Sequence, residues 1–488
     1  MKLFKKIALL IITAALFQSC FSDFDDNSNS NVKDFVWKGM NYVYLYKYDV
    51  PDLYNYESAT DVEYNNYLNG FSSPEELFES LKYDNSPEFV DRFSDLFSDY
   101  LQLEQFLSGT TVSNGMDYVL YKKPENENEV FGIVRYVLPN TSAESQGVKR
   151  GDVFDGLDGN PLTVNNFTDV YNLNSYSINL ATYDNNGTAG FTDDDLIISG
   201  TESISLTKSA YTENPILKAK IINVGENNVG YLMYNAFTAD FDTELNNTFS
   251  TFLSSNITDL VLDLRYNSGG SVRSAIDLSS MITGQFYNDI FVTEEWNSEW
   301  QTHYEQTDPE SLINRFSNEI RTGSAINSLN LNKVYILTTK ATASASELVI
   351  NGLDPHIEVI QIGTTTTGKY QASITLYDSS DFGRQGANPN HTYALQPLIF
   401  KTVNKDGVSD YYEGLIPLEI NTVVEDFANL GVLGDEAEPL LAAAIAHIEG
   451  SSRIGQFSHD VPKEIGDSKM FSPIKNRMYT DKKLPFRY

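Results

Sequence analysis

Two side chains of this 488-residue chain have the types and spacing of a nucleophile and its base. Ser344 follows an apolar strand pattern, Val334–Leu337, and precedes a helical pattern, Glu347–Leu353. Lys369 lies 25 residues later, after a second strand pattern, Ile357–Ile362. A serine at a helix N-terminus has unpaired backbone N–H groups beside its hydroxyl, and these can stabilise a developing oxyanion. Two parallel strands of one sheet can bring both groups to the same edge.

A glycine-rich turn is the second feature with chemical potential. The run Leu262-Asp263-Leu264-Arg265-Tyr266-Asn267-Ser268-Gly269-Gly270 reads as an apolar strand that ends in a glycine pair. Ser271 then caps a helix predicted to run through Met281. Glycines let the backbone approach a ligand and direct N–H groups at it, although a tight turn alone can also require them. Asp263 and Arg265 share a strand face, so we expect them to form a structural ion pair.

Other catalytic groups are poorly represented. The chain has five histidines, none of them in a motif: His303, His356, His391, His447 and His459. The sequence has no His-x-x-x-His pair and no clustered cysteines, so neither metal catalysis nor a cofactor is expected. Lys369 is therefore the candidate base, which requires a pKa well below the ordinary lysine value. Glu347, in the first turn of its helix, is interpreted as structural because an acid there complements the helix dipole.

The N-terminal residues have the pattern of an export signal. Three lysines precede the apolar run Ile7–Phe17, and the only cysteine of the chain, Cys20, follows. Residues 1–19 are predicted to be a signal peptide, too short to span a membrane stably. The stretch resembles a bacterial lipoprotein signal, which implies lipidation of Cys20; Phe17 departs from the usual leucine. A polar tether would follow over 20–32.

The charge balance limits the partners. The chain has 67 acidic against 34 basic residues and a net charge of −33. Such a surface repels nucleic acid and anionic lipid, so binding to either is not expected. The hydrophobic content of 41% is that of a globular protein, and the length predicts roughly two to four domains.

A helical domain is predicted over residues 33–107. Ser73 and Pro74 form a good helix start, with serine as N-cap and proline in the first turn. A second helix is predicted from apolar residues with helical spacing, namely Phe89, Phe93, Leu96, Phe97 and Leu101.

Residues 108–210 change to strand-like runs separated by Gly, Asn and Asp turns. The segment 141–153 resembles the short helix and turn of a PDZ domain. The residues Gly115, Met116 and Asp117 resemble the loop that holds a peptide carboxylate, next to a sheet edge that can add a strand. The acidic stretch 183–200 does not have EF-hand spacing and is predicted to be a solvated hairpin.

The remaining residues alternate strands and helices. Over 215–450 this pattern predicts an α/β domain with a mainly parallel sheet, interrupted by an insertion-like stretch over 288–330. The fold class is thus α/β and multidomain: an N-terminal helical region, a PDZ-like β-rich domain and a mainly parallel α/β domain. The C-terminal tail, 451–488, has no clear periodicity and is assigned no role.

Together these motifs resemble the C-terminal processing (tail-specific) serine proteases. The resemblance rests on the glycine-turn motif, on Ser344-Ala345-Ser346-Glu347 and on Gly368-Lys369, in that order. It implies Ser344 as nucleophile and Lys369 as general base. It also implies an oxyanion hole formed by the N–H of Ala345 and of the glycine pair Gly269 and Gly270, with Gly269 preferred.

One position departs from the family pattern. Many relatives have a glutamine four residues after the lysine, where it orients the lysine; here that position is Ser373, and the nearest glutamine is Gln371. In an extended segment both residues share a face with Lys369, so either can assist. Gln371 is taken as the candidate third member.

The resulting hypothesis is a lipid-anchored serine endopeptidase of a Gram-negative cell envelope, bound to the outer membrane through Cys20. Its partners would be proteins or peptides with exposed C-termini, captured by the PDZ-like domain. The alternative is a non-catalytic protein that binds a peptide or other ligand on the same scaffold. A further option is a protease that stays silent until a substrate peptide moves the PDZ-like domain.

Overall fold

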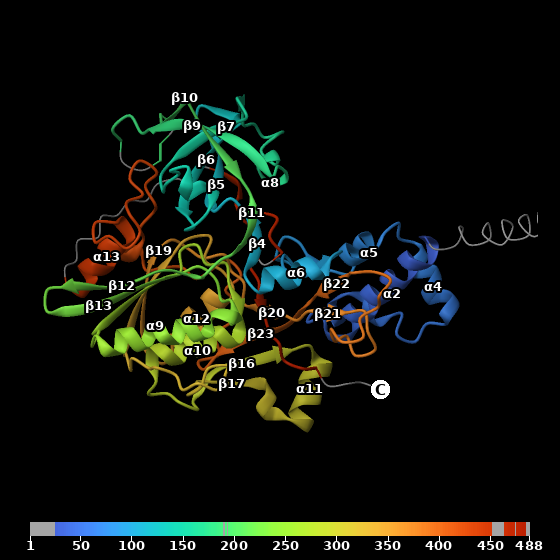
Figure 1. Cartoon of the computed structure of the whole chain (residues 1–488). Coiled ribbons are helices and arrows are strands. Elements are labelled where there is room, and N and C mark those ends of the chain that lie inside the picture. Colours follow the sequence, from blue (N-terminus) through green and yellow to red (C-terminus); the bar gives the residue numbers. More distant parts are fainter. Residues whose placement is uncertain (1–24, 189–190, 193, 451–462, 474, 485–488) are drawn as a thin grey trace, which may run out of the picture.

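The computed structural model describes residues 25–188, 191–192, 194–450, 463–473 and 475–484. Cys20 and the predicted signal peptide lie outside these residues. Figure 1 shows a β-rich domain standing above an α/β domain, with the N-terminal helical region extending to one side. Within the described part of the chain, no helix combines the length and the apolar character needed to cross a membrane.

The α/β domain is built on a five-stranded sheet of order β12-β13-β14-β18-β19. The strands are β12 (Ile216–Val224), β13 (Asn227–Tyr234), β14 (Asp259–Asp263), β18 (Lys333–Thr338) and β19 (Glu358–Gly363). β12 pairs antiparallel with β13, and the other three pairings are parallel. The strands predicted near Val334–Leu337 and Ile357–Ile362 are confirmed as neighbours, so both deliver their following loops to one edge.

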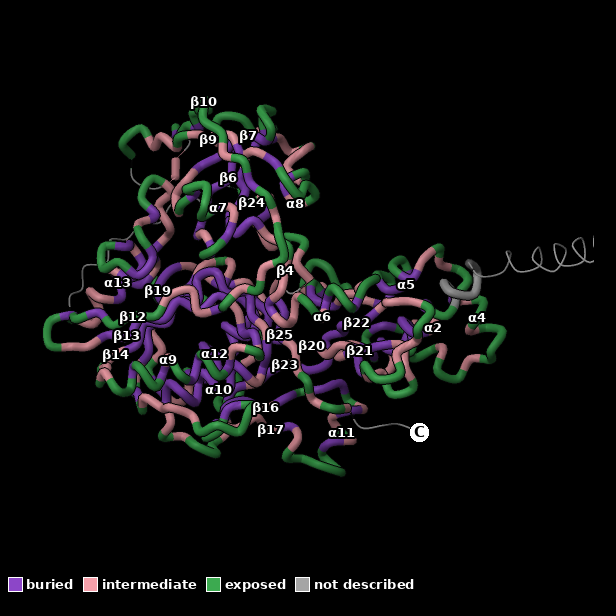
Figure 2. The backbone as a smooth tube through the Cα atoms, in the orientation of Figure 1, coloured by how far each residue is buried: buried purple, intermediate pink, exposed green. Residues whose placement is uncertain are grey.

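Alternate side chains of these strands fill two separate cores. Leu232, Leu262 and Ile336 pack on one face with helices α9 (Asp242–Ser254), α10 (Val272–Thr283) and α12 (Ala345–Leu353). Tyr231, Val261 and Leu337 pack on the other face with α13 (Pro439–Ile448). The result is a three-layer arrangement in which the strands are buried, as the purple tube in Figure 2 shows.

A second sheet, which the sequence patterns did not predict, flanks this core. Its order is β15-β25-β20-β23-β16-β17. The strands are β15 (Gly270–Ser271), β25 (Met478–Tyr479), β20 (Gln371–Ser373), β23 (Leu398–Asn404), β16 (Ile290–Trp296) and β17 (Ile313–Arg315). The stretch 288–330 is therefore not a separate insertion: β16 and β17 belong to this sheet, and α11 (Ser298–Thr307) lies between them.

The N-terminal region contains α2 (Asp25–Val43), α3 (Pro51–Tyr54), α4 (Asp61–Asn69), α5 (Pro74–Ser80) and α6 (Tyr100–Leu107). The helix start at Ser73 is confirmed, because its side chain accepts a hydrogen bond from Glu76 N at 3.2 Å. The helix predicted from the Phe89–Leu101 spacing is wrong. The structure has β2 (Phe89–Val90) and β3 (Asp95–Phe97) there, and β3 pairs with β22 (Ala394–Gln396) of the α/β domain.

The β-rich domain is a sheet of order β10-β9-β7-β6-β5-β24, with β8 (Asn160–Pro161) paired to β7. Its strands are β5 (Met116–Lys123), β6 (Asn126–Val137), β7 (Val153–Leu157), β9 (Ser175–Asp184) and β10 (Leu196–Thr207). The short helices α7 (Ser142–Ser145) and α8 (Asp169–Asn172) accompany it. β9 and β10 form the predicted hairpin, and β4 (Thr110–Ser113) pairs with β11 (Ser209–Thr212) at the junction with the α/β domain.

The edge strand of this sheet comes from the C-terminal tail. β24 (Glu464–Asp467) pairs antiparallel with β5, and β25 enters the second sheet of the α/β domain. A segment with no periodicity in the sequence therefore has two defined strands, because each of them is specified by the edge to which it pairs.

Candidate active site

Ser344 occupies a strained turn between β18 and α12. Its backbone has φ 64° and ψ −115°, a left-handed conformation that a residue with a side chain adopts only when its surroundings impose it, at a cost of about 1–3 kcal/mol. The residue is completely buried, and its Oγ has no hydrogen-bond partner among the described residues. Ala345 follows as the first residue of α12, where its N–H has no partner within the helix.

Lys369 is also completely buried, and its Nζ likewise makes no hydrogen bond to any residue the structure describes. The Nζ lies 5.1 Å from the centre of the Phe93 ring. Burial holds the pKa of Lys369 well below its usual range, and the nearby Arg477 guanidinium lowers the pKa further. Asp91 and Glu347 oppose this shift to a smaller extent. The environment thus favours the neutral amine, the form that can accept a proton.

One carboxylate connects the two loops. Glu347 Oε2 accepts hydrogen bonds from Ser344 N at 2.7 Å and from Lys369 N at 2.9 Å. Its Oε1 accepts from Gly368 N at 2.7 Å and from the Thr366 hydroxyl. All four partners are donors and favour the ionised carboxylate, whereas burial is the larger effect and raises the pKa of Glu347 above its usual range. Glu347 is structural, as predicted, but its role is to hold the Ser344 loop against the Lys369 loop.

Replacing Glu347 with glutamine should separate these loops. An amide group can accept on one side only, so two buried donors lose their acceptor, which should destabilise the fold by about 2–4 kcal/mol. The loss should be measured by urea unfolding and should accompany a fall in any activity of the site. Glu244→Gln is the matched control, because Glu244 is exposed at the same third position of α9. Equal effects of the two substitutions would contradict the role given to Glu347.

The glycine turn lies directly against Ser344. A Cβ built on Gly269 would stand 2.6 Å from Ser344 Cβ and 2.9 Å from Ser344 Oγ. Asn267, a buried residue whose role the sequence did not reveal, organises the turn: its Oδ1 accepts from Gly269 N at 2.8 Å. Its backbone carbonyl accepts from Ala343 N at 3.0 Å and from Ser346 Oγ at 3.1 Å.

The two glycines differ in where their N–H groups point. The N–H of Gly269 is engaged by Asn267, whereas the N–H of Gly270 donates to the backbone carbonyl of Arg477 at 2.6 Å. In this conformation Gly270, rather than the preferred Gly269, presents its N–H to a carbonyl group. The oxyanion-hole roles of Gly269, Gly270 and Ala345 stay predictions.

The close approach gives a test of the turn. Gly269→Ala should abolish turnover or reduce it by at least about a hundredfold, because the methyl group displaces the serine from its geometry. Gly269 also has φ 110°, so strain adds to the clash. Gly323→Ala is the control: Gly323 has φ 81°, but its added Cβ would meet nothing within 4 Å. Normal cleavage by the Gly269→Ala protein would show that the turn does not touch the reacting atoms.

The remaining predicted residues have other neighbours. Gln371 Nε2 donates to Tyr46 Oη at 3.0 Å, and its Oε1 is buried without a partner among the described residues. Ser373 Oγ donates to the Met478 carbonyl at 3.2 Å. Neither residue has a hydrogen bond to Lys369 Nζ within the described chain. The role of Gln371 therefore stays a prediction.

The predicted carboxylate loop is closed by its own side chains. Gly115 N donates to Ser113 Oγ at 2.9 Å, and Met116 N donates to Asn114 Oδ1 at 3.0 Å. Asp117 accepts from Arg135 Nε at 2.6 Å. Residues of this loop, Gly115–Asp117, and residues of the glycine turn, Ser268–Gly270, nevertheless line one cavity of about 260 Å³.

The predicted ion pair is confirmed. Arg265 Nε donates to Asp263 Oδ1 at 2.8 Å, and its Nη2 donates to Glu438 Oε2 at 2.9 Å, with all three side chains buried. The cluster ties β14 to the N-terminus of α13 and does not reach the serine loop through any of these bonds. Within the ranges the structure describes, no three His, Cys, Asp or Glu side chains are placed to hold a metal ion.

Comparisons with known proteins find similarity to peptidases. The model of peptidase family S41 matches residues 228–385, and the model of the S41 N-terminal domain matches residues 31–95. The chain is 25% identical over 287 residues to carboxyl-terminal-processing peptidase 2 of Arabidopsis thaliana, covering 53% of this chain and 49% of that protein. It is 24% identical over 328 residues to the C-terminal processing peptidase of Tetradesmus obliquus, covering 63% and 61%.

The chain thus spans about half to three fifths of the length of the curated relatives it matches. A solved structure described as a putative S41 protease from Bacteroides fragilis aligns with a TM-score of 0.65 and 25% identity, covering 85% of this chain and 97% of that one. The range matched by the S41 model, 228–385, contains the glycine turn, Ser344 and Lys369. Over the ranges matched by the family models the chain is similar to peptidase family S41, and its curated relatives include C-terminal processing peptidases.

Proposed function

We propose that the chain is a serine endopeptidase with a Ser344–Lys369 dyad. The observation that carries the proposal is the pair of buried side chains without hydrogen-bond partners among the described residues, whose backbones are held by the single carboxylate of Glu347. A structural serine or lysine that is fully buried normally pairs its polar atom, because an unpaired one is costly. Two such groups beside a strained turn are typical of a reactive site.

The proposed reaction is acyl transfer. The neutral Lys369 amine takes the proton of Ser344 Oγ while Oγ bonds to the scissile carbonyl carbon. The carbonyl oxygen becomes an oxyanion, stabilised by the N–H of Gly270 and Ala345. Lys369 then gives its proton to the leaving amine as the C–N bond breaks. In the second half, Lys369 takes a proton from a water molecule that attacks the acyl carbon, and returns this proton to Ser344 Oγ as the ester bond breaks.

We further propose that the β-rich domain is PDZ-like and presents substrates to this site. The cavity that joins Gly115–Asp117 to the glycine turn supports a path between a recognition loop and the nucleophile. The substrates would be proteins or peptides with exposed C-termini.

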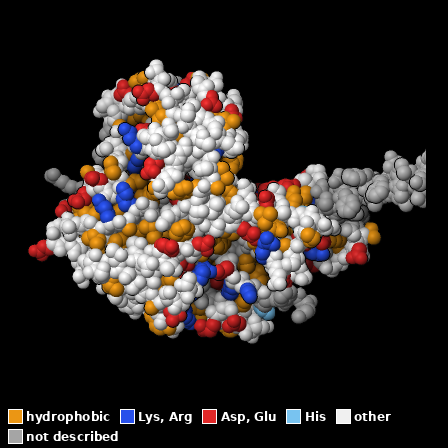
Figure 3. Space-filling view, viewed as in Figure 1, with side chains coloured by type: hydrophobic (Ala, Val, Ile, Leu, Met, Phe, Trp, Pro, Cys, Tyr) orange, Lys and Arg blue, Asp and Glu red, His pale blue; other side chains and the backbone are white. Residues whose placement is uncertain are grey.

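Anchoring through Cys20, at the outer membrane of a Gram-negative envelope, belongs to the same proposal. The acidic side chains spread over the visible face agree with a surface that avoids nucleic acid (Figure 3).

A serine-reactive fluorophosphonate probe tests the dyad against a non-catalytic binding protein. The wild-type protein should be labelled at Ser344, and Lys369→Ala should lose labelling while its thermal unfolding shows a folded protein. Ser346→Ala, which alters the neighbouring serine, should keep the label. If the wild-type protein resists the probe even when substrate peptide is added, the dyad is not a catalytic unit. Labelling that appears only with the peptide would identify the gated form of the enzyme.

A further inference from the structure

The described residues 463–473 and 475–484, called here the 463–484 segment, follow the path that a substrate would take. β24 of this segment adds to the β5 edge, with Asp467 opposite Val119 and Gly466 opposite Leu120. It is antiparallel to β5, so it runs toward the loop Gly115–Asp117. An extended strand on a sheet edge is a common mode of peptide recognition.

Contacts from β5 and from α8 hold this strand in place. Ser468 N donates to the Tyr118 carbonyl at 2.8 Å, and Ser468 Oγ donates to Asp117 Oδ2 at 2.7 Å. From α8, Tyr171 Oη donates to the Asp467 carbonyl at 2.8 Å, and its ring meets the Phe471 ring edge-on at 4.9 Å. The β5 edge to which a peptide could add is thus occupied by the chain itself, and Ser468, Lys469 and Phe471 line the cavity beside it.

The segment then enters the candidate active site. β25 lies between β15 and β20 and pairs parallel with both. Thr480 N donates to the Ser373 carbonyl at 3.0 Å. Without β25, the strands β15 and β20 would face each other across a gap of about 9–10 Å, which is the space for one strand.

Arg477 is placed as a substrate residue would be. Its carbonyl accepts the Gly270 N–H, and a Cβ built on Gly269 would stand 2.5 Å from this carbonyl oxygen and 2.9 Å from Ser344 Oγ. The carbonyl therefore lies on the same side of the turn as the nucleophile.

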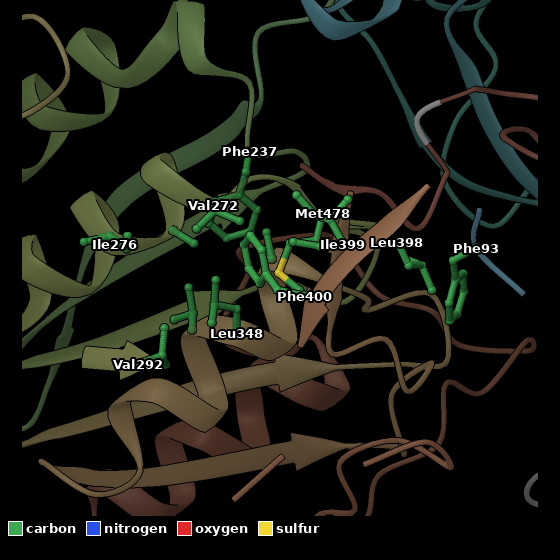
Figure 4. Close-up of a cluster of buried hydrophobic side chains, with 14 of the residues drawn as sticks. Phe93, Phe237, Val272, Ile276, Val292, Leu348, Leu398, Ile399, Phe400 and Met478 are labelled. Carbon is green, nitrogen blue, oxygen red and sulfur yellow. The ribbon is translucent and has the colours of Figure 1, made fainter. Parts of the chain in front are cut away.

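The Arg477 side chain fills a pocket of its own. The guanidinium is buried, binds the Asp95 carboxylate and the Phe93 carbonyl, and lies 5.4 Å from the Phe97 ring. Arginine suits this combination of carboxylate, carbonyl and aromatic face. Next along the chain, Met478 packs among apolar side chains that include Phe400 (Figure 4).

We propose that the 463–484 segment is a built-in occupant of the substrate site, anchored by Arg477, and that the site accepts extended peptides with a basic residue followed by an apolar one. The expected consequence, that the segment competes with substrate, rests on the proposed peptidase function. A substrate must displace Arg477 and refill the Met478 position. Only molecules in which the segment is displaced can bind substrate, so the apparent affinity is the intrinsic affinity multiplied by the fraction of such molecules.

The test measures binding in the Ser344→Ala background, where no chemistry is needed. The probe is a fluorescent synthetic peptide with the sequence of residues 470–482, followed by anisotropy. Adding Arg477→Ala to the protein should tighten peptide binding by about tenfold, because the internal competitor loses its anchor. Asp95→Asn in that double variant should weaken binding, and a peptide with alanine in place of the arginine should bind weakly to every variant.

Phe471→Ala keeps the proposal testable if Arg477→Ala fails to fold, since Phe471 is 62% exposed and its loss spares the core. It should also tighten peptide binding, by a smaller factor. Unchanged peptide binding in folded variants of both kinds would overturn the proposal and make the segment a permanent strand of the fold. With Ser344 intact, Arg477→Ala should raise cleavage of an unfolded protein about tenfold when the rate is measured at a pH above the Lys369 midpoint, where the loss of the Arg477 charge no longer reduces the neutral amine. Peptide binding without any cleavage would reject the peptidase but retain the occupant.

Discussion

Ser344→Ala is expected to reduce cleavage of an unfolded protein substrate by about 10⁵-fold, because removal of a nucleophile eliminates the acyl-enzyme route. The fold should persist. Ser344 Oγ makes no hydrogen bond to a described residue, so its loss leaves no orphaned partner, and only the small space of one oxygen is vacated. The measurement is the cleavage rate together with the thermal unfolding midpoint, which should change by no more than a few degrees.

Ser346→Ala provides the control for this result. Ser346 is buried two residues away, and its Oγ donates to the Asn267 carbonyl at 3.1 Å. This variant should lose some stability, about 1 kcal/mol, and retain most of its turnover. A Ser344→Ala protein that cleaves as fast as Ser346→Ala would exclude Ser344 as the nucleophile.

Lys369→Ala is expected to have an equally large effect, and Lys369→Arg should not rescue it, because a guanidinium stays charged and cannot accept the serine proton. Lys340→Ala is the matched control, since Lys340 is an exposed lysine on the preceding loop that contacts the Thr366 carbonyl at 3.4 Å. Cleavage by Lys369→Arg at a substantial fraction of the wild-type rate would contradict the role of base.

The same residue predicts a pH dependence. The active form is the neutral amine, so activity should rise with pH as Lys369 loses its proton. The folded-state pKa lies well below the ordinary value of 10.5, because burial and Arg477 both disfavour the ammonium. The midpoint of the kcat/KM profile should therefore lie below that value, and Arg477→Ala should move it upward by removing a neighbouring positive charge. A downward shift would be inconsistent with this electrostatic account.

Local patterns were sufficient where one segment specifies its own structure. The N-cap at Ser73, the strands before Ser344 and Lys369, and the helix after Ser271 were all predictable, because capping and hydrophobic periodicity are encoded within a few residues. The pairing of Asp263 with Arg265 followed from their shared strand face.

The Phe89–Leu101 stretch shows where such patterns fail. Its apolar residues have helical spacing, but β3 pairs with β22, a strand almost 300 residues away in sequence. Pairing to a distant edge overrides local preference, since sheet hydrogen bonds and packing are supplied by another part of the chain. The β16 and β17 strands within 288–330 were missed for the same reason.

The sequence by itself determined the chemical types at the site: a serine at a helix start, a lysine after the neighbouring strand, and a glycine turn. The tertiary structure decided their relations. Only the fold shows that Glu347 binds the backbones of Ser344 and Lys369, and that Gly269 lies against Ser344. The fold also places Arg477 beside the glycine turn and Ser344. This contact joins segments that are more than 100 residues apart in sequence, through strand pairing at a sheet edge, and no local residue spacing encodes it.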